Sequence, residues 1–329
     1  MTINTRHVDQ RTVRSALSLA AAAPSVHNSQ PWRWVVGPHT VRLYADLARW
    51  LPATDTRGRD MIVSCGAALH HARVALAAAG LASSVHRMPD IDEPDHLAVL
   101  HLHPRTADDT DLTLAAAIMR RRTDRRPFTD WEVPAAFVDE LSERAADHGA
   151  QLRPVTGARS RARLIEAMQV AAAAQESNVA YLAEHASWNG RYADVEGIPS
   201  VDLVRDAVAS GGATVRRFSD GFIGQPSDGE PDGALLTVLA TASDDPLSQL
   251  RAGEALSAVL LHATDLGLAT CPLSQPLEVA SSRRVVQDDV LGGTAAPQLV
   301  LRVGWAPLGT PLRPTPRRMI DDMIKQLPL

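Results

Sequence analysis

Closely spaced polar side chains lie between Pro24 and Trp32, where the chain must turn. Pro24 ends an Ala-rich helical run, and Pro31 biases the residue before it toward an extended backbone. The polar residues of this stretch are Ser25, His27, Asn28, Ser29 and Gln30. A stiff loop rich in donors and acceptors suits a polar, planar ligand. An ordinary turn has a similar composition and remains the alternative.

Arginines form a second chemical feature, because five of them occur in the seven positions from Arg120 to Arg126. Such closely spaced cations repel one another, and a dianion bound among the guanidinium groups relieves the repulsion. Phosphate is the natural candidate, since a guanidinium fork matches its oxygens. A solvated charged surface is the alternative interpretation.

Other reactive residues give weaker patterns. Cys65 and Cys271 form no CxxC pair or zinc spacing, so buried free thiols in a reducing compartment are expected. His70-His71 and His101-x-His103 lack a carboxylate or Cys to complete a ligand set, so no metal centre is predicted. No GxGxxG follows an expected strand, and there is no P-loop or GxSxG motif.

Composition narrows the function classes. The 329 residues include 45% hydrophobic and 22% charged residues, as in globular proteins, and are enough for two packed units. The net charge of −5 argues against nucleic acid or an acidic membrane as partner. The run Val13–Ala23 imitates a signal peptide, but serines interrupt it, and no run of 18 apolar residues occurs. A cytoplasmic protein without a membrane span is expected.

Hydrophobic periodicity and turn residues predict alternating helices and strands. The expected helices are Thr12–Ala23, Arg59–Ala79, Leu112–Arg122, Pro134–His148, one or two within Ala158–His185, and Pro246–Leu266. The expected strands are Trp32–Val36, Thr40–Tyr44, Ser83–Arg87, His96–His103, Gln151–Pro154, Ala234–Ala240 and Pro297–Val303. The hairpin-like strand neighbours favour an α+β sandwich over a doubly wound sheet.

Two segments of the chain repeat. Gly66–Gly80 and Gly253–Gly267 have the same length (80 − 66 = 14; 267 − 253 = 14), and several Ala and Leu residues match at that offset. Internal similarity of this kind indicates duplication. A polar, acidic stretch at 104–111 predicts a boundary between halves 1–106 and 107–329. The Gly-rich segment 186–233 is expected to be either disordered or functional, as a lid.

The two polar features carry a resemblance. The pattern Pro-Ser-x-x-Asn-x-Gln-Pro-Trp at 24–32 resembles the flavin-contacting motif of the nitroreductase family of FMN proteins. Arg121-Arg122-Thr123-x-Arg125 resembles the family's Arg-Arg-Ser-x-Arg phosphate motif, with Thr in place of Ser. The family also has an arginine near its C-terminus that completes the phosphate site. Arg317 matches that arginine, and Arg318, one position along, is the alternative. Ser274-Gln275 aligns with the family's Glu-Gly beside the reactive flavin edge, and this departure puts the usual nicotinamide geometry in doubt.

The resemblance implies an FMN cofactor and assigns residues to its parts. The expected contacts to the isoalloxazine and ribityl groups come from Ser25, Val26, His27, Asn28, Ser29 and Gln30. The expected phosphate ligands are Arg121, Arg122, Thr123, Arg125 and Arg317. Backbone amides at Ser274 and Gln275 would face the reactive edge. Because the flavin carries the chemistry, no catalytic acid or base is assigned.

Each half holds the motif that the other lacks, which predicts a nitroreductase-like fold in two tandem halves that form an intramolecular pseudo-dimer. One complete and one degenerate flavin site would result, and the chain could be a monomer. This arrangement is similar to the Acg-type branch of the family, single-chain proteins among the dormancy-associated proteins of actinobacteria. The resemblance implies reduction of nitroaromatics or quinones with NADH or NADPH. The alternative is FMN storage, with 186–233 shutting out NAD(P)H.

Overall fold

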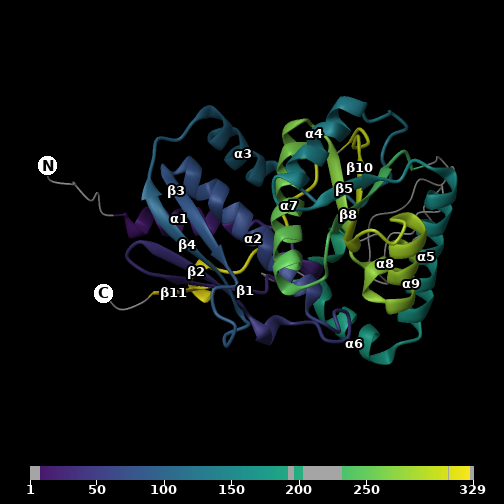
Figure 1. Cartoon of the computed structure of the whole chain (residues 1–329), viewed down its shortest axis with the longest axis horizontal. Coiled ribbons are helices and arrows are strands. Elements are labelled where there is room, and N and C mark those ends of the chain that lie inside the picture. Colours follow the sequence, from purple (N-terminus) through teal and green to yellow (C-terminus); the bar gives the residue numbers. More distant parts are fainter. Residues whose placement is uncertain (1–7, 192–195, 203–231, 310, 327–329) are drawn as a thin grey trace, which may run out of the picture.

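The computed structural model describes residues 8–191, 196–202, 232–309 and 311–326. Two sheets stand on either side of a pair of long central helices, α2 (Arg59–Ala78) and α7 (Pro246–Asp265) (Figure 1). The first sheet has the strand order β11-β1-β2-β4-β3, and the second has the order β5-β8-β10-β9. The predicted α+β class and two-half arrangement are confirmed.

The other elements up to β4 are α1 (Gln10–Ala20), η1 (Val26–Asn28), β1 (Trp32–Val36), β2 (Thr40–Ala45), η2 (Leu47–Arg49), β3 (Leu81–Arg87) and β4 (His96–Pro104). From there to β8 they are α3 (Asp109–Arg120), α4 (Ala135–Ala146), β5 (Gln151–Pro154), α5 (Ala158–Glu176), α6 (Val179–Trp188), β6 (Asn189–Arg191), β7 (Ile198–Pro199), η3 (Ser200–Asp202) and β8 (Leu235–Thr241). The last elements are β9 (Ala269–Leu273), α8 (Gln275–Glu278), α9 (Ala280–Val285), η4 (Val286–Val290), β10 (Ala296–Gly304), η5 (Ile320–Asp322) and β11 (Ile324–Gln326).

Local sequence explains where the helices begin and end. The side chain of Asp9 accepts hydrogen bonds from the first turn of α1, and Asp245 caps α7 directly before a proline. Helix α1 ends at Ala20, three residues before the predicted end, because the chain already turns ahead of Pro24.

The two sheets repeat the same topology. The order β1-β2-β4-β3 in the first half corresponds to β5-β8-β10-β9 in the second, and a long helix follows the second strand in each. Helices α5 and α6 are inserted between β5 and β8, where the first half has only the short turn at 37–39. The internal repeat found in the sequence therefore corresponds to a repeat of the fold.

The repeated glycines lie at the crossing of the central helices. A Cβ on Gly66 would lie 2.1 Å from the carbonyl oxygen of Leu250, and one on Gly253 would lie 2.0 Å from that of Val63. Each partner follows from the other by the repeat offset (66 + 187 = 253; 63 + 187 = 250). Such reciprocal contacts are those of a two-fold interface, here formed inside one chain.

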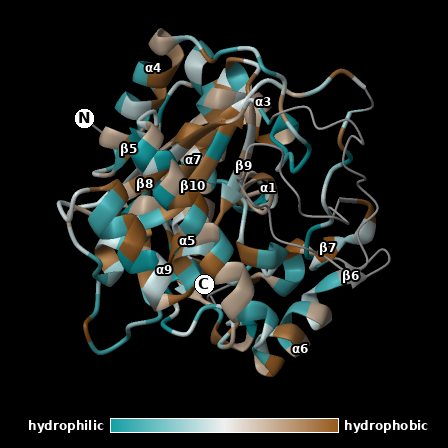
Figure 2. Ribbon diagram, turned by 90° about the vertical axis from the view of Figure 1, so that its right-hand side faces the viewer, coloured by the Kyte–Doolittle hydropathy of each residue, from teal (hydrophilic) through white to brown (hydrophobic). Residues whose placement is uncertain are grey.

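The two sheets differ in how they are covered. Alternate residues of β10 belong to different clusters: Leu299 and Leu301 pack toward α4 and α7, whereas Val300 packs toward α5. All nine residues of β10 are buried. Brown, hydrophobic residues accordingly gather on β8, β10 and α7 in Figure 2. The first sheet has one solvent-facing side, where His101 and His103 on β4 are exposed.

Among the described residues, α2 alone is long and apolar enough to cross a membrane by length and composition. Most of it (78%) is buried inside the protein, where it packs on α1, α3 and α7. Burial of this extent is usual for a core helix.

The C-terminal tail contributes a strand that the sequence did not predict. After η5 it forms β11, which pairs in parallel with β1 and extends the first sheet (Figure 1). Helices α8 and α9 were also not predicted, since each is too short to show a clear periodicity. The predicted irregular segment 186–233 begins inside α6, and its part from 203 to 231 lies outside the described residues.

Replacing Gly66 by Ala tests the helix crossing. The added methyl group meets backbone atoms, which cannot rotate away, so unfolding free energy should fall by at least roughly 2 kcal/mol. Denaturant titration measures the change. Gly157→Ala is the control, because there the nearest atom is a side-chain oxygen 3.8 Å away. Equal stability of the two variants would contradict the close approach.

Candidate functional site

The loop between α1 and β1 has an unusual backbone. His27, Asn28 and Gln30 have φ angles of 47°, 53° and 50°, in the left-handed region that residues with a Cβ seldom adopt. His27 and Asn28 are nearly buried, and Gln30 is fully buried. Three such residues within four positions indicate that the surroundings impose the loop conformation, as is frequent at ligand sites.

Hydrogen bonds fix this loop to itself and to α2. The Gln30 amide donates to Ser25 Oγ at 2.9 Å, and the Val26 amide donates to Ser64 Oγ at 3.2 Å. Ser64 in turn donates to the Asp60 carbonyl at 2.6 Å. Since Asp60 and Ser64 are four residues apart, they lie on the same face of α2.

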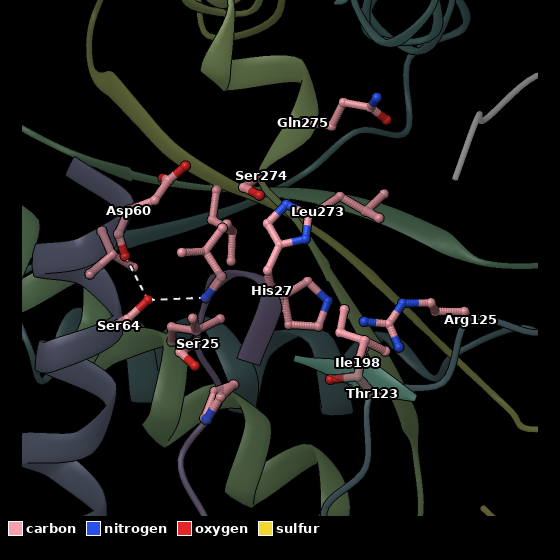
Figure 3. A pocket seen from close by; sticks show the side chains of 16 residues that line it. Ser25, His27, Asp60, Ser64, Thr123, Arg125, Ile198, Leu273, Ser274 and Gln275 are labelled. Carbon is pink, nitrogen blue, oxygen red and sulfur yellow. Dashed lines mark hydrogen bonds between the residues drawn. The ribbon is translucent and has the colours of Figure 1, made fainter. Parts of the chain in front are cut away.

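A pocket lies beside this loop and takes its walls from both halves (Figure 3). It has a volume of about 800 Å³, its open mouth included. Seven of the predicted site residues line it: Ser25, Val26, His27, Thr123, Arg125, Ser274 and Gln275. The remaining lining residues were not predicted: Pro24, Asp60, Val63, Ser64, Ile198, Leu256, Pro272, Leu273 and Leu299.

The second half brings its residues to the pocket through β9 and the strand-like arginine segment. Thr123 forms a bridge with Thr270, and the Asp124 amide donates to the Thr270 carbonyl at 2.9 Å. This pairing sets Thr123 and Arg125 beside the start of β9. In Figure 3 the guanidinium of Arg125 points toward His27 of the other half.

The end of β9 is held by a closed set of polar side chains. Ser274 Oγ donates to Glu278 at 2.7 Å, and Gln275 Nε2 donates to Gln175 at 2.8 Å. Gln175 in turn donates to Glu278 at 2.5 Å. The side chains of Ser274 and Gln275 therefore have protein partners, while both residues still line the pocket.

Three predicted residues of the loop lie behind the pocket wall. Asn28 Nδ2 donates to the carbonyls of Gly197 at 2.8 Å and Pro316 at 3.0 Å. The Gln30 side-chain oxygen accepts from the Arg318 amide at 2.8 Å, and Ser29 is fully buried. These residues hold the loop against the insertion and the C-terminal tail.

Three of the five predicted phosphate ligands, Arg121, Arg122 and Arg317, form a cationic cluster at the end of α1, in which Arg121 is buried and the other two are partly buried. Arg317 donates to the carbonyls of Ala21 at 2.9 Å and Ala22 at 3.1 Å, and Arg121 donates to Ala22 at 3.3 Å. Arg122 lies close enough to repel both guanidinium groups. Arg318 is directed elsewhere, toward the Gln30 carbonyl at 2.9 Å.

The electrostatics of this cluster are unfavourable for the protein alone. Burial, with repulsion from Arg317 and Arg122, lowers the pKa of Arg121 to about 9. Burial, with repulsion from Arg122, lowers the pKa of Arg317 to about 10. Within the described part of the chain, Nε and Nη1 of Arg121 and Nε of Arg122 have no hydrogen-bond partner. Buried cations with unused donors are what an anion site requires.

Comparison with protein-family models gives no match. Relatives from Mycobacterium tuberculosis are similar over nearly the whole chain. One, named "Putative NAD(P)H nitroreductase Rv3131", is 44% identical over 328 residues, which cover 98% of this chain and 94% of that protein. Another of that name, acg, is 39% identical over 324 residues, 94% of each chain. The chain belongs to the nitroreductase family.

A solved structure gives a weaker likeness. The FMN and NADPH-dependent nitroreductase NfnB from Sphigopyxis sp. strain HMH is 20% identical, with a TM-score of 0.41, over 66% of this chain and 99% of that one. The family assignment is based on the mycobacterial relatives.

Within this nitroreductase chain, the position related to the pocket by the internal repeat is filled. Arg87 corresponds to Ser274 (87 + 187 = 274) and donates to Glu254 at 2.6 and 2.9 Å. Arg73 donates to the same carboxylate at 3.0 Å, and Glu254 is fully buried. The repeat-related position therefore holds an internal ion pair, and the degenerate second flavin site stays a prediction.

A pair of acidic residues, Asp55 and Asp60, lies at the start of α2, where Asp60 lines the pocket. Asp60 Oδ1 accepts from Arg59 at 3.0 and 2.7 Å, and Asp55 Oδ2 accepts from the Met61 amide at 2.9 Å. Burial, with repulsion from Asp60, raises the pKa of Asp55 to about 7. Neither carboxylate was predicted as a site residue. Polar Asp60 and Ser64 at i and i+4 on an apolar helix were the available signal.

The pH dependence of folding stability should reflect the raised pKa of Asp55. In the folded protein Asp55 keeps its proton up to about pH 7, whereas in the unfolded chain it loses the proton at lower pH. The stability that this group gives the wild-type protein is therefore lost as the pH rises through about 7. Asp55→Asn should therefore gain stability relative to wild type between about pH 4 and pH 8, by roughly 3 kcal/mol at the upper end. Urea titrations at several pH values measure the difference. Asp109→Asn, at an exposed position on α3, is the control, and a difference independent of pH would contradict the burial of Asp55.

Proposed function

We propose that the chain binds one FMN and uses it to pass electrons from NADH or NADPH to small acceptors such as nitroaromatics or quinones. The observation that carries this proposal is the buried arginine cluster next to a pocket built by both halves. Family membership supports the same reaction class, since the mycobacterial relatives are named as NAD(P)H nitroreductases.

The cluster fits a phosphate group chemically. Arg121 and Arg122 offer buried N–H donors that no described group accepts, and Arg317 adds a third charge. A dianion there would satisfy the donors and offset the mutual repulsion of the cations. Arg317, rather than Arg318, is assigned to this role because its guanidinium lies at the end of α1 with Arg121.

The pocket fits a planar ring system. It is a concave space whose walls are mainly apolar with a few polar groups, as is usual for small-molecule sites. Val26, Leu256 and Leu299 provide apolar surface, while Thr123 and Arg125 provide hydrogen-bond donors at its edge. When bound, FMN would supply the hydride and electron transfer, whereas these residues would position it and exclude water.

Removing either cluster arginine should weaken the retention of FMN. Arg121→Ala and Arg317→Ala should each cost roughly 1.5–3 kcal/mol of binding free energy, as for a hydrogen bond to a charged group. Absorbance of bound flavin after dialysis measures retention. Arg120→Ala is a matched control, because Arg120 belongs to the same run but is exposed and pairs with Asp265. Stoichiometric FMN in both variants would reject the phosphate assignment.

Storage of FMN without turnover is the second candidate, and contacts of the insertion favour it. His27 Nδ1 lies 3.3 Å from the Asn189 side-chain oxygen, and Asn28 bonds the Gly197 carbonyl. Ile198 lines the pocket directly. The insertion thus covers one side of the loop, and a complete cover would exclude NAD(P)H.

Anaerobic addition of NADPH or NADH separates the two candidates. We expect rapid loss of the oxidised flavin absorbance, because the pocket opens to solvent and a nucleotide could therefore reach it. Flavin that stays oxidised with both nucleotides, yet is reduced by dithionite, would instead indicate storage.

Several narrower inferences belong with this proposal. They are the domain boundary at 106/107, a lid within 186–233, a monomeric state and a cytoplasmic location. The internal helix crossing supports the monomer, since it already supplies the interface that a pair of subunits would otherwise form.

A further inference from the structure

A second cavity adjoins the candidate flavin pocket. It has a volume of about 920 Å³, its mouth included, and many of its lining residues are charged. Its charged lining residues are Asp55, Arg57, Arg59, Asp244, Glu278, Arg283 and Arg284. Arg57 and Arg284 are exposed, so water has access from this side.

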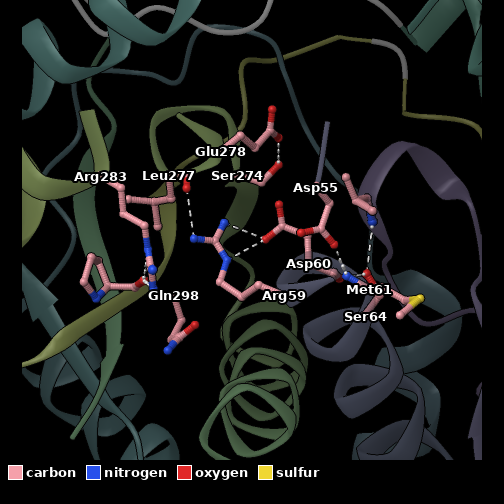
Figure 4. Close-up of polar contacts among 12 residues, drawn as sticks. Asp55, Arg59, Asp60, Met61, Ser64, Ser274, Leu277, Glu278, Arg283 and Gln298 are labelled. Atoms are coloured by element: carbon pink, nitrogen blue, oxygen red, sulfur yellow. Dashed lines mark hydrogen bonds and ion pairs between the residues drawn. The ribbon is translucent and has the colours of Figure 1, made fainter. Parts of the chain in front are cut away.

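The wall between the two cavities is made of charged side chains from both halves. Asp55 lines the second cavity, and Asp60 lines the first. Figure 4 shows Arg59 reaching both Asp60 and the backbone of Leu277, with Asp55 next to Asp60. Glu278 belongs to the same wall and accepts a hydrogen bond from Ser274 of the first pocket.

The inner part of this wall carries more carboxylates than guanidinium groups. Asp60 and Glu278 act on Asp55 as negative charges, and Arg59 acts as a positive one. The outer cavity adds Asp244, which is paired with Arg283, together with Arg57 and Arg284. Three carboxylates around one buried guanidinium would leave excess negative charge in a poorly solvated wall. Retaining a proton on one of them reduces that cost.

We propose that Asp55 and Asp60 relay protons from the second cavity to the candidate flavin pocket. The proposal rests on the proposed reductase function. A hydride brings two electrons and one proton, so reduction of a quinone to a hydroquinone consumes one further proton. Asp60 gives that proton to the acceptor, Asp55 gives its proton to Asp60, and water in the second cavity reprotonates Asp55. Arg59 keeps Asp60 in place through the transfer.

A single-turnover experiment tests the relay without NAD(P)H. Protein loaded with FMN is reduced by light in the presence of EDTA and mixed anaerobically with a benzoquinone. We expect Asp55→Asn and Asp60→Asn each to slow reoxidation about tenfold or more, as for loss of a proton donor. The wild-type rate should fall as the pH rises through about 7, and Asp55→Asn should lose that dependence. Acetate or imidazole should restore the rate of Asp55→Asn, because the second cavity admits small acids.

Two further measurements distinguish loss of the relay from misfolding of the variants, and they do not depend on catalytic turnover. Carbon-13 spectra of labelled aspartate carboxyls should show one group titrating near neutral pH in wild type and none in Asp55→Asn. Asp109→Asn should behave as wild type in both experiments, and thermal melts confirm that the variants are folded. Unchanged reoxidation in the Asp55 and Asp60 variants, absence of rescue, or no carboxyl titrating near neutrality would overturn the relay.

Failure of the proposed function has a different signature. Flavin that NADH and NADPH do not reduce, while photoreduced protein still transfers electrons to quinone in an Asp55-dependent way, would reject the nucleotide reductase and retain the relay. Photoreduced protein that does not react with quinone would reject the relay itself.

Discussion

The close approach of α2 and α7 is the contact on which the rest of the structure depends. Both helices carry a glycine at the crossing, and each glycine faces backbone of the other helix. Backbone-to-backbone packing at this distance leaves little freedom in how the two sheets are placed. The pocket takes residues from the N-terminal part of α2 and from β9, which follows α7, so its shape is set by the same crossing.

The candidate site contains energetically unfavourable features, and the rigid packing of α2 on α7 helps to maintain them. Three residues of the α1–β1 loop adopt left-handed backbone angles, and the arginine cluster buries repelling charges. Neither feature would persist in a loosely packed region. Asn28 donates hydrogen bonds to both the insertion and the C-terminal tail, so two distant parts of the chain stabilise one strained turn.

The sequence alone was sufficient to find those features whose pattern lies within a few neighbouring residues. The proline-bracketed loop, the arginine run and the repeated glycines are each visible within a few residues, and the structure places them around one pocket or at one helix crossing. Residues that reach the pocket through tertiary packing, such as Ile198 and Leu299, had no such signal. Strand β11 was missed because three residues have no readable period, and its pairing with β1 joins positions almost 300 residues apart.

Arg317 and β11 contact parts of the protein that precede them by almost 300 residues, which affects how the chain folds during synthesis. The arginine cluster and the outer edge of β1 both need residues beyond 316, which emerge from the ribosome after the other strands of both sheets. The first half therefore emerges with one edge of β1 unpaired and without Arg317 at the end of α1. A chain interrupted before Arg317 would keep that edge exposed and would lack one of the three guanidinium groups of the cluster.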